Sequence, residues 1–180
     1  MKPRHSTTEE GTSLVHEHVP ARRSRPSVHG NKGTRVEKVV TINRRPEELF
    51  SFWRNFENLP RVMEHIESVE CQDRRRSHWR LRWPKNKVVE WDAEIINEHP
   101  NELIAWRTLE GSDVQHAGSI RFTPAPGARG TEVKLAVEYE TSKFANFLAK
   151  VFRRSPEQQI EEDLRRFKQL MEGGETTAAQ

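Results

Sequence analysis

The sequence predicts an α+β fold in which a curved antiparallel sheet wraps around one long C-terminal helix. Seven segments between residues 34 and 140 are β-rich or alternate apolar and polar side chains, the period of a strand with one dry face. Short turns separate several of them, which favours an antiparallel meander. The pattern becomes helical only after Ser142. A single long helix must then cover the dry face, so we expect a gap between sheet and helix that can become a pocket.

The first elements are a strand over 34–42 and a short helix that begins at Pro46. Proline is favoured at the first helical position, and Glu47 and Glu48 suit the first turn. Pro60 is expected to end or interrupt this helix. Its apolar face consists of Leu49, Phe50, Phe52 and Trp53.

Six further strands are expected at about 65–73, 76–83, 88–98, 102–109, 114–123 and 130–140. In "VEWDAEI", which begins at Val89, apolar and acidic residues alternate strictly. The turn sequences "PKN", "HPN", "EGSD" and "PAPGARG" lie between strands. This alternation predicts that one face of the sheet is buried and the other is exposed to solvent.

The sequence after Ser142 predicts two helical segments. The first is "KFANFLAKVF", and the second is a final helix that begins with a clear start signal. Ser155 is the expected N-cap, Pro156 the first helical residue, and Gln158 completes a capping box. Gly173 is expected to end the helix. Its charged stretch "EEDLRR" (161–166) is interpreted as the solvated face. The buried stripe is expected to contain Ile160, Leu164, Phe167 and Met171.

Composition divides the chain into residues 1–33, a disordered tail, residues 34–174, the folded domain, and residues 175–180, a flexible C-terminus. Charged residues make up 32% of the chain and apolar residues 33%, which is polar for a fully folded protein. The tail carries the whole formal charge of +3, so the domain is neutral by count and a nucleic-acid partner has little support. No apolar run is long enough for a signal peptide or membrane span, and a cytoplasmic location is expected.

Cysteine and histidine usage gives only a weak indication of a metal site and none of a cofactor. Cys71 stands alone, which excludes an intrachain disulfide and a cysteine-rich zinc site. It shares parity with Val69, so a buried, inert thiol is expected. The pair His16 and His18 is a weak metal motif inside the tail.

A basic stretch that contains the third strand and its two flanking turns has two interpretations. It contains Arg74, Arg75, Arg76, Arg80, Arg82, Lys85 and Lys87. One interpretation is a phosphate-binding strip for RNA or an anionic membrane surface. The other is a set of cross-strand ion pairs with the acidic strand that follows. In the register that we expect, Arg80 lies opposite Asp92, and the turn Arg74–Arg76 stays available for an anionic membrane surface.

The remaining pairs of that register follow from matching the apolar faces across the turn. Trp83 is expected opposite Val89 and Leu81 opposite Trp91 on the inner face. Arg82 opposite Glu90 and His78 opposite Glu94 then complete the outer face.

Two polar residues fall on the inner face by parity, His116 and Tyr139. An imidazole in an apolar cavity can act as a general base, and a phenol can donate a hydrogen bond. The alternatives are a purely structural pair, or a parity error that places His116 in water. Gly118, on the same face, is interpreted as a bend or bulge.

Four tryptophans are expected on the same concave face: Trp79, Trp83, Trp91 and Trp106. They could fill a solid core, but four indoles under a single helix suit a ligand cavity better.

Specific stretches resemble the bacterial cyclase/dehydrase group of the START-like (SRPBCC) superfamily: "FSFWRNFENLPRVMEHIESVE", "VEWDAEIINEHPNELIAWRT" and "SPEQQIEEDLRRFKQLMEGGE". The resemblance covers roughly residues 35–174. It implies a helix-grip fold with a hydrophobic cavity between sheet and helix, but not a particular activity. The chain departs from the family where "ETSKFANF" stands in place of a Pro/Gly-rich turn before the helix.

Together, pattern and resemblance predict that the protein binds a hydrophobic small molecule, such as a lipid, quinone or polyketide-like compound, without a cofactor. The alternatives are an aromatase/cyclase or dehydratase, for which His116, Tyr139 and Arg107 are the available groups, and a regulatory interaction domain. The predicted ligand-binding residues are Trp79, Trp83, Trp91, Trp106, His116, Phe122, Tyr139 and Phe167.

Overall fold

The computed structural model describes residues 33–83, 87–112, 114–140 and 155–173. Its strands are β1 (Gly33–Ile42), β2 (Ile66–Cys71), β3 (Arg76–Trp83), β4 (Lys87–His99), β5 (Leu103–Thr108), β6 (His116–Pro124) and β7 (Thr131–Glu140). Its helices are α1 (Pro46–Arg54), the 3-10 helices η1 (Phe56–Arg61) and η3 (Pro126–Ala128), and α3 (Pro156–Gly173).

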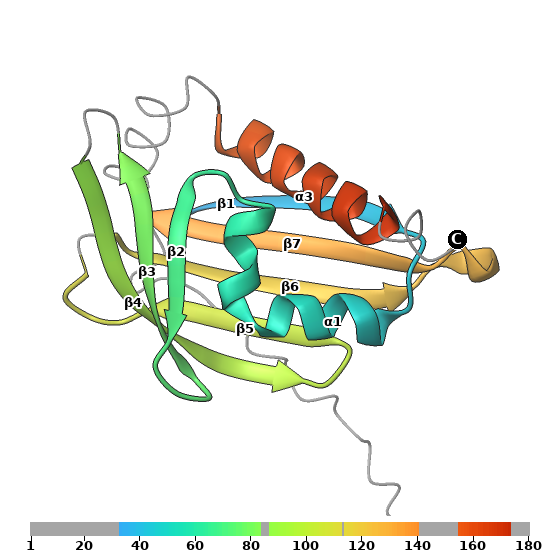
Figure 1. Ribbon diagram of the computed structural model, residues 1–180, viewed down its shortest axis with the longest axis horizontal. Helices are drawn as coiled ribbons and strands as arrows, with labels where there is room; N and C mark the ends of the chain where they lie inside the picture. The colour runs from blue at the N-terminus through green and yellow to red at the C-terminus, as the bar shows by residue number, and fades with distance from the viewer. Residues whose placement is uncertain (1–32, 84–86, 113, 141–154, 174–180) are drawn as a thin grey trace, which may run out of the picture.

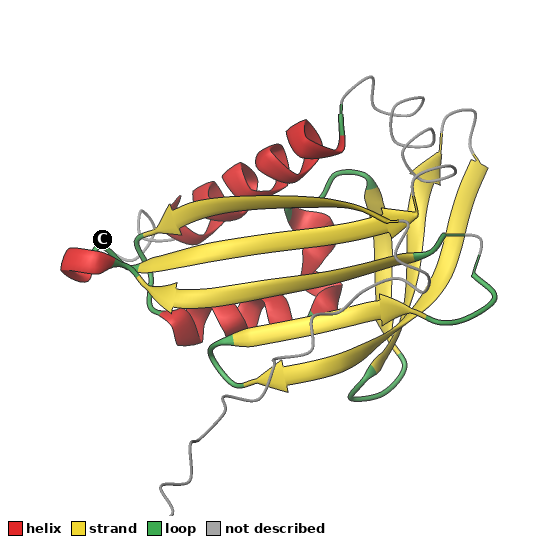
Figure 2. Ribbon diagram, turned by 180° about the vertical axis from the view of Figure 1, so that it is seen from behind, coloured by secondary structure: helices red, strands yellow, loops and turns green. Residues whose placement is uncertain are grey.

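The strands form one antiparallel sheet in the order β1-β7-β6-β5-β4-β3-β2. The sheet is curved, and α1, η1 and α3 lie on its concave side (Figure 1). Seen from behind, the strands lie in front of these helices (Figure 2). The predicted α+β architecture, a helix-grip fold with a curved sheet around a long C-terminal helix, is therefore confirmed.

The long helix α3 begins where its sequence signal predicts. Gln158 N–H donates to Ser155 Oγ at 3.3 Å, and Ser155 N–H donates to Gln158 Oε1 at 3.1 Å, so the capping box is formed. Ile160, Leu164 and Phe167 are buried against the sheet and α1. Because most of the stability of a helix comes from such an apolar face, these residues fix α3 over the concave side.

The first helix ends earlier than Pro60 requires. α1 stops at Arg54, and Asn55 accepts a hydrogen bond from Glu57 N–H at the start of η1. Pro60 lies inside η1, where the tighter 3-10 turn accommodates it. The break lets Trp53 and Phe56 contact different parts of the core. The ring centroids of Trp53 and Phe167 are 5.2 Å apart, and those of Phe56 and Trp79 are 5.4 Å apart.

The expected register between β3 and β4 is wrong by two residues. Trp79, not Leu81, lies opposite Trp91, and Arg80 lies opposite Glu90. The predicted pairing of Arg80 with Asp92 is therefore also wrong. Trp83 pairs with Lys87 rather than with Val89, so three residues, 84–86, lie between the innermost pair instead of the five that the expected register leaves. A shift of two residues keeps every side chain on its own face, so alternation does not distinguish the two registers and the length of the turn decides.

The remaining outer pairs of this hairpin shift in the same way. Arg80 Nε lies 3.0 Å from Glu90 Oε1, and His78 Nδ1 lies 2.9 Å from Asp92 Oδ1. The expected pairing of the basic strand with its acidic neighbour is thus confirmed with different partners, as an ion pair at Arg80 and a histidine–carboxylate contact at His78. Arg82 lies opposite Val88 instead of Glu90, and Trp83 lies opposite Lys87 instead of Val89. His78 lies opposite Asp92 instead of Glu94.

The turn of three arginines is organised by an acidic residue directly before it. Asp73 Oδ1 accepts hydrogen bonds from the backbone N–H groups of Arg75 and Arg76, both at 2.7 Å. Arg75 Nε donates to the Ile95 carbonyl at 3.0 Å. Contact of this turn with an anionic membrane surface stays a prediction.

Cys71 is exposed, so the expectation of a buried thiol is wrong. It is the last residue of β2, and β2 is the edge strand of the sheet. Parity places Cys71 on the face of Val69, which is buried, but at the end of an edge strand fewer elements cover that face.

Several expectations lie outside the described residues: residues 1–32 of the tail with the pair His16 and His18, the helical segment "KFANFLAKVF" and the C-terminus 175–180. Among the helices that the structure describes, none combines the length and apolar character that crossing a membrane requires.

Candidate functional site

A small cavity lies between the concave face of the sheet and the N-terminal half of α3. Its volume is about 80 Å³. This is space for several water molecules, whereas pockets for drug-sized ligands measure about 300–1,000 Å³. The apolar and aromatic residues that line it are Met63, Ile66, Trp79, Leu81, Trp91, Trp106, Leu135, Val137, Tyr139, Pro156 and Ile160. The inner face is therefore neither solidly packed nor hollow enough, as it stands, for a lipid-sized ligand.

Three of the four predicted tryptophans line this cavity. The rings of Trp79 and Trp91 stack with centroids 6.0 Å apart, as their opposite positions in β3 and β4 require. Trp106 lines the cavity from β5, and the centroid of its ring lies 5.7 Å from that of the Phe56 ring. For the fourth, Trp83, the structure describes the backbone in β3 but not the side chain.

Gly118 marks no bulge, which is one of the two roles that we expected for it, a bend or a bulge. β6 runs past it without a register shift, with Trp106 on one side and Val137 on the other, so the residue marks no bulge. A Cβ atom at this position would lie 2.3 Å from Cζ2 of Trp106. The absence of a side chain at Gly118 therefore makes room for the indole of Trp106 in the cavity wall.

Two of the indole groups in the cavity wall keep unused hydrogen-bond donors. Trp79 Nε1 donates to Ser77 Oγ at 2.8 Å. The Nε1 atoms of Trp91 and Trp106 are buried and have no acceptor among the residues that the structure describes. Buried donors are nearly always satisfied by protein, water or ligand, so these two N–H groups can donate to a guest in the cavity.

His116 and Tyr139 both lie inside, as parity predicts, and they are direct neighbours across β6 and β7. The His116 and Trp91 rings are nearly perpendicular, with their centroids 5.4 Å apart. Burial lowers the pKa of His116 to about 4, so the imidazole is neutral near pH 7. Burial also raises the pKa of Tyr139, with a smaller contribution from Glu157. Both groups can exchange hydrogen bonds with a ligand, but such a weakly basic imidazole is poorly matched to proton abstraction at neutral pH.

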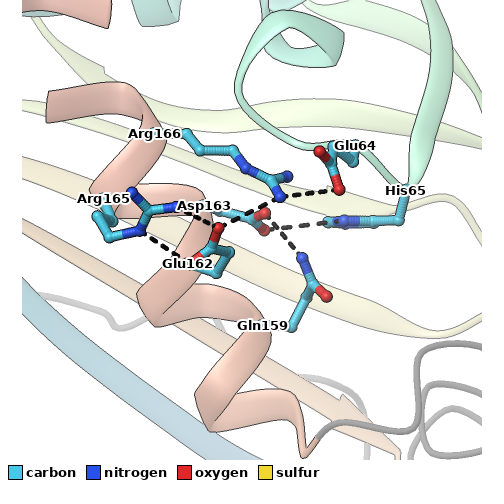
Figure 3. A network of polar contacts seen from close by, with 7 residues as sticks. All are labelled: Glu64, His65, Gln159, Glu162, Asp163, Arg165 and Arg166. Carbon is cyan, nitrogen blue, oxygen red and sulfur yellow. Dashed lines mark hydrogen bonds and ion pairs between the residues drawn. The ribbon is translucent and has the colours of Figure 1, made fainter. Parts of the chain in front are cut away.

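A second polar group at the cavity was missed by the sequence analysis (Figure 3). Asp163 from α3 is 3% exposed, and its Oδ1 accepts a hydrogen bond from Gln159 Nε2 at 2.9 Å. Its Oδ2 lies 3.8 Å from Nδ1 of His65, which precedes β2. All three side chains line the cavity.

Burial sets the protonation states of this group. It raises the pKa of Asp163 to about 7, although Gln159 and Arg166 act in the opposite direction. It lowers the pKa of His65 to about 4, assisted by the positive charge of Arg166. Between these values both groups are neutral, so the contact between them is not an ion pair. Asp163 is the carboxyl group at the cavity whose protonation changes near neutral pH.

Charged residues surround the outer side of this group. Arg166 Nη2 lies 2.8 Å from Glu64 Oε2 and 3.2 Å from Glu162 Oε1, and Arg165 also pairs with Glu162 at 2.6 Å. Figure 3 shows these pairs beside Asp163. The charge of Arg166 is thus balanced by two carboxylates.

Helical spacing could have identified Asp163 from the sequence. The expectation that Asp163 lies on the solvated face with the rest of "EEDLRR" is wrong. The residue lies three positions after Ile160 and four before Phe167, which places it within the buried stripe. Because Asp163 stands among the charged residues of "EEDLRR", the helical spacing that marks it as buried is easily overlooked.

Three other candidates lie away from the cavity. Phe122 packs against Phe50 with ring centroids 6.0 Å apart, and Phe167 packs against Trp53. Neither lines the cavity, and both fill the core near α1. Arg107 is exposed and binds Glu94 with Nε and Nη2 at 2.9 and 2.8 Å, so it does not reach the cavity.

A larger depression of about 820 Å³ opens at the other end of the molecule. It is a groove on the surface rather than a cavity, near the start of α1 and the end of α3. Its lining includes Arg44, Arg45, Arg61, Phe52 and Leu170. We consider the smaller cavity the candidate site, because enclosure by apolar walls with a few buried polar groups is typical of small-molecule sites. Among the described residues, no three His, Cys, Asp or Glu side chains are arranged to hold a metal ion.

Comparison with known proteins gives concordant results. The family model described as polyketide cyclase / dehydrase and lipid transport matches residues 42–167. A crystal structure of a Deinococcus radiodurans protein is 39% identical, with a TM-score of 0.65, covering 78% of this chain and 99% of that one. The Zhui aromatase/cyclase of Streptomyces sp. R1128 has the same fold at 17% identity, with a TM-score of 0.61, covering 82% and 98%. An uncharacterized 17.2 kDa protein of Streptomyces lincolnensis is 29% identical over 143 residues, which cover 77% of this chain and 90% of that protein.

Proposed function

Because the chain belongs to the polyketide cyclase/dehydrase and lipid transport family, we propose that it binds a hydrophobic small molecule in the cavity between the sheet and α3. The family supports ligand binding or cyclase activity in general. The finer proposal is a binding protein for a lipid, a quinone or a polyketide-like ring compound. The observation that carries it is the pair of buried, unsatisfied indole N–H groups in an apolar wall.

These two donors favour a ligand that is mostly apolar but carries oxygen atoms. Trp91 and Trp106 are 5% and 4% exposed, so water does not freely solvate their N–H groups. Leaving a buried donor unsatisfied costs about 1–3 kcal/mol, which a ligand oxygen would recover. Contact with the indole rings supplies the apolar part of the binding energy at about 25 cal/mol per Å² buried.

The volume of the cavity sets a condition on this proposal. A benzene-sized guest needs about 150 Å³, so a ring compound enters the 80 Å³ cavity only if side chains in the wall move. We therefore expect ligand binding to shift the rotamers of the cavity tryptophans.

A second candidate function is an aromatase/cyclase or dehydratase. The neighbouring His116 and Tyr139 favour it, since such reactions need a base and a hydrogen-bond donor near the substrate carbonyl. The low pKa of His116 weighs against it as a base at neutral pH. Binding without turnover is for this reason the leading proposal.

The test uses naphthalene as an apolar probe and the indole ¹H–¹⁵N resonances of the full-length chain as the readout. The chain has five tryptophans, so each resonance can be assigned by substitution to Phe. Naphthalene should shift the signals of Trp79, Trp91 and Trp106 in a saturable way. Trp53 is the internal control, because it is equally buried but lies outside the cavity.

Calorimetry on the same samples should give a negative heat-capacity change. The variant Trp91→Phe should weaken binding severalfold while it leaves the fold intact. If naphthalene and larger ring compounds leave the cavity tryptophans unchanged up to their solubility limits, the binding proposal fails.

A further inference from the structure

The polar end of the cavity has the geometry of a binding site for one oxygen atom. Asp163 Oδ2 and His65 Nδ1 are 3.8 Å apart, which is too long for a direct hydrogen bond. An oxygen atom between them can lie about 2.8 Å from each, the usual length of such a bond. The other carboxyl oxygen, Oδ1, is already engaged by Gln159, which fixes the orientation of the carboxyl group.

The charges around this position favour a neutral ligand. The groups that face Asp163 are His65 from the segment before β2, Arg166 and Glu162 from α3, and Glu64. Arg166 contacts both glutamates through Nη2, and their carboxylates already balance its charge, while its buried Nη1 has no hydrogen-bond partner among the described residues. The opposite walls of the cavity are apolar and aromatic. Bringing a charged ligand into such surroundings would carry a large desolvation penalty.

We propose that the cavity selects neutral ring compounds that carry a hydroxyl group, and that this hydroxyl lies between Asp163 Oδ2 and His65 Nδ1. The inference rests on the proposed binding function and adds the polar group that the ligand must have. A hydroxyl both donates and accepts, so it can donate to the Asp163 carboxylate while it accepts a hydrogen bond from Nδ1–H of neutral His65, the tautomer that this arrangement requires. A bare carbonyl oxygen offers no proton and is repelled by an ionised carboxylate.

The matched probes are 2-naphthol and naphthalene, which differ by one hydroxyl group. Calorimetric titration of the full-length chain at pH 8 should give a dissociation constant for 2-naphthol at least about tenfold lower than for naphthalene, since hydrogen bonds to charged groups are the stronger kind. At pH 6, where Asp163 is mostly protonated, the preference should be smaller, because the carboxylate acceptor is lost.

The variants Asp163→Leu and Asp163→Asn separate this inference from the proposed function. Asp163→Leu should lose the preference for 2-naphthol and keep the affinity for naphthalene. Asp163→Asn, which is isosteric and the safer variant for folding, should show a preference that no longer changes between pH 6 and 8. Glu161→Gln, an exposed carboxylate of the same helix bound to Lys38, is the matched control and should behave like the wild type.

The outcomes are distinct. If naphthalene binds but 2-naphthol is not preferred in the wild type at pH 8, the hydroxyl site is wrong and the binding function stands. A preference that persists unchanged in both Asp163 variants also overturns the site. If neither probe binds, the proposed function itself fails.

Discussion

Replacing Asp163 by Asn should change how the stability of the protein depends on pH. The folded protein keeps a proton on Asp163 up to pH 7, whereas the unfolded chain releases it near pH 3.8. Between these values the native state binds more protons than the unfolded state, so raising the pH destabilises the native state. At 1.36 kcal/mol per pH unit, the full effect is about 4 kcal/mol of stability lost between pH 4 and 8.

The two buried histidines act in the opposite direction. His65 and His116 have folded-state pKa values of about 4, below the ordinary value of 6.5, because burial disfavours the charged ring. The unfolded chain binds these protons up to pH 6.5, so each histidine makes the native state more stable as the pH rises through this window. The wild type therefore combines two rising contributions with one falling contribution.

Asp163→Asn removes the falling contribution alone. Subtracting the wild-type free energy of unfolding from that of the variant should give a difference that rises with pH, by up to about 4 kcal/mol between pH 4 and 8. Urea denaturation followed by tryptophan fluorescence at half-unit pH steps measures this difference. Glu161→Gln, which removes an exposed ion pair with Lys38, is the control and should give a nearly constant offset. A difference for Asp163→Asn that stays constant within about 1 kcal/mol across the range would refute the buried, proton-binding carboxyl.

Two further predictions test the sheet. A double-mutant cycle on Arg80 and Glu90, which are 3.0 Å apart, should give a favourable coupling of about 0.2–1 kcal/mol that weakens with salt. The same cycle on Arg80 and Asp92 should give a coupling near zero, and the reverse result would restore the rejected register. Gly118→Ala should destabilise the protein by about 1–3 kcal/mol, because its Cβ would overlap the Trp106 ring. Urea denaturation measures the loss, and Trp106→Leu in the same chain should recover part of it; a neutral Gly118→Ala would show that the ring moves freely.

Local pattern was enough to place the three cavity tryptophans on the buried face and to locate the start of α3. Alternation placed Trp79, Trp91 and Trp106 on the buried face, and all three line the cavity. The capping box could also be predicted from the sequence, because its partners, Ser155 and Gln158, lie three residues apart. Such features depend on backbone geometry within a few residues, and the sequence displays that geometry directly.

Other features depended on contacts between distant segments. The partner of Arg80 followed from the length of the turn, since both registers bury the same faces. Phe122 and Phe167 are apolar and inward-facing, yet their position near α1 assigns them to the core rather than to the cavity. Cys71 has the parity of a buried residue and is exposed because its strand ends at the sheet edge.

By itself the sequence determined the order of the elements, the buried face of each strand and the start of α3, because periodicity and capping act over one or two turns of chain. The tertiary structure decided the size of the cavity and its polar end. His65 and Asp163 are nearly a hundred positions apart in the chain, and no local pattern relates them. They meet only because α3 crosses the concave face of the sheet, and their burial there, rather than their residue types, brings the pKa of Asp163 close to neutral.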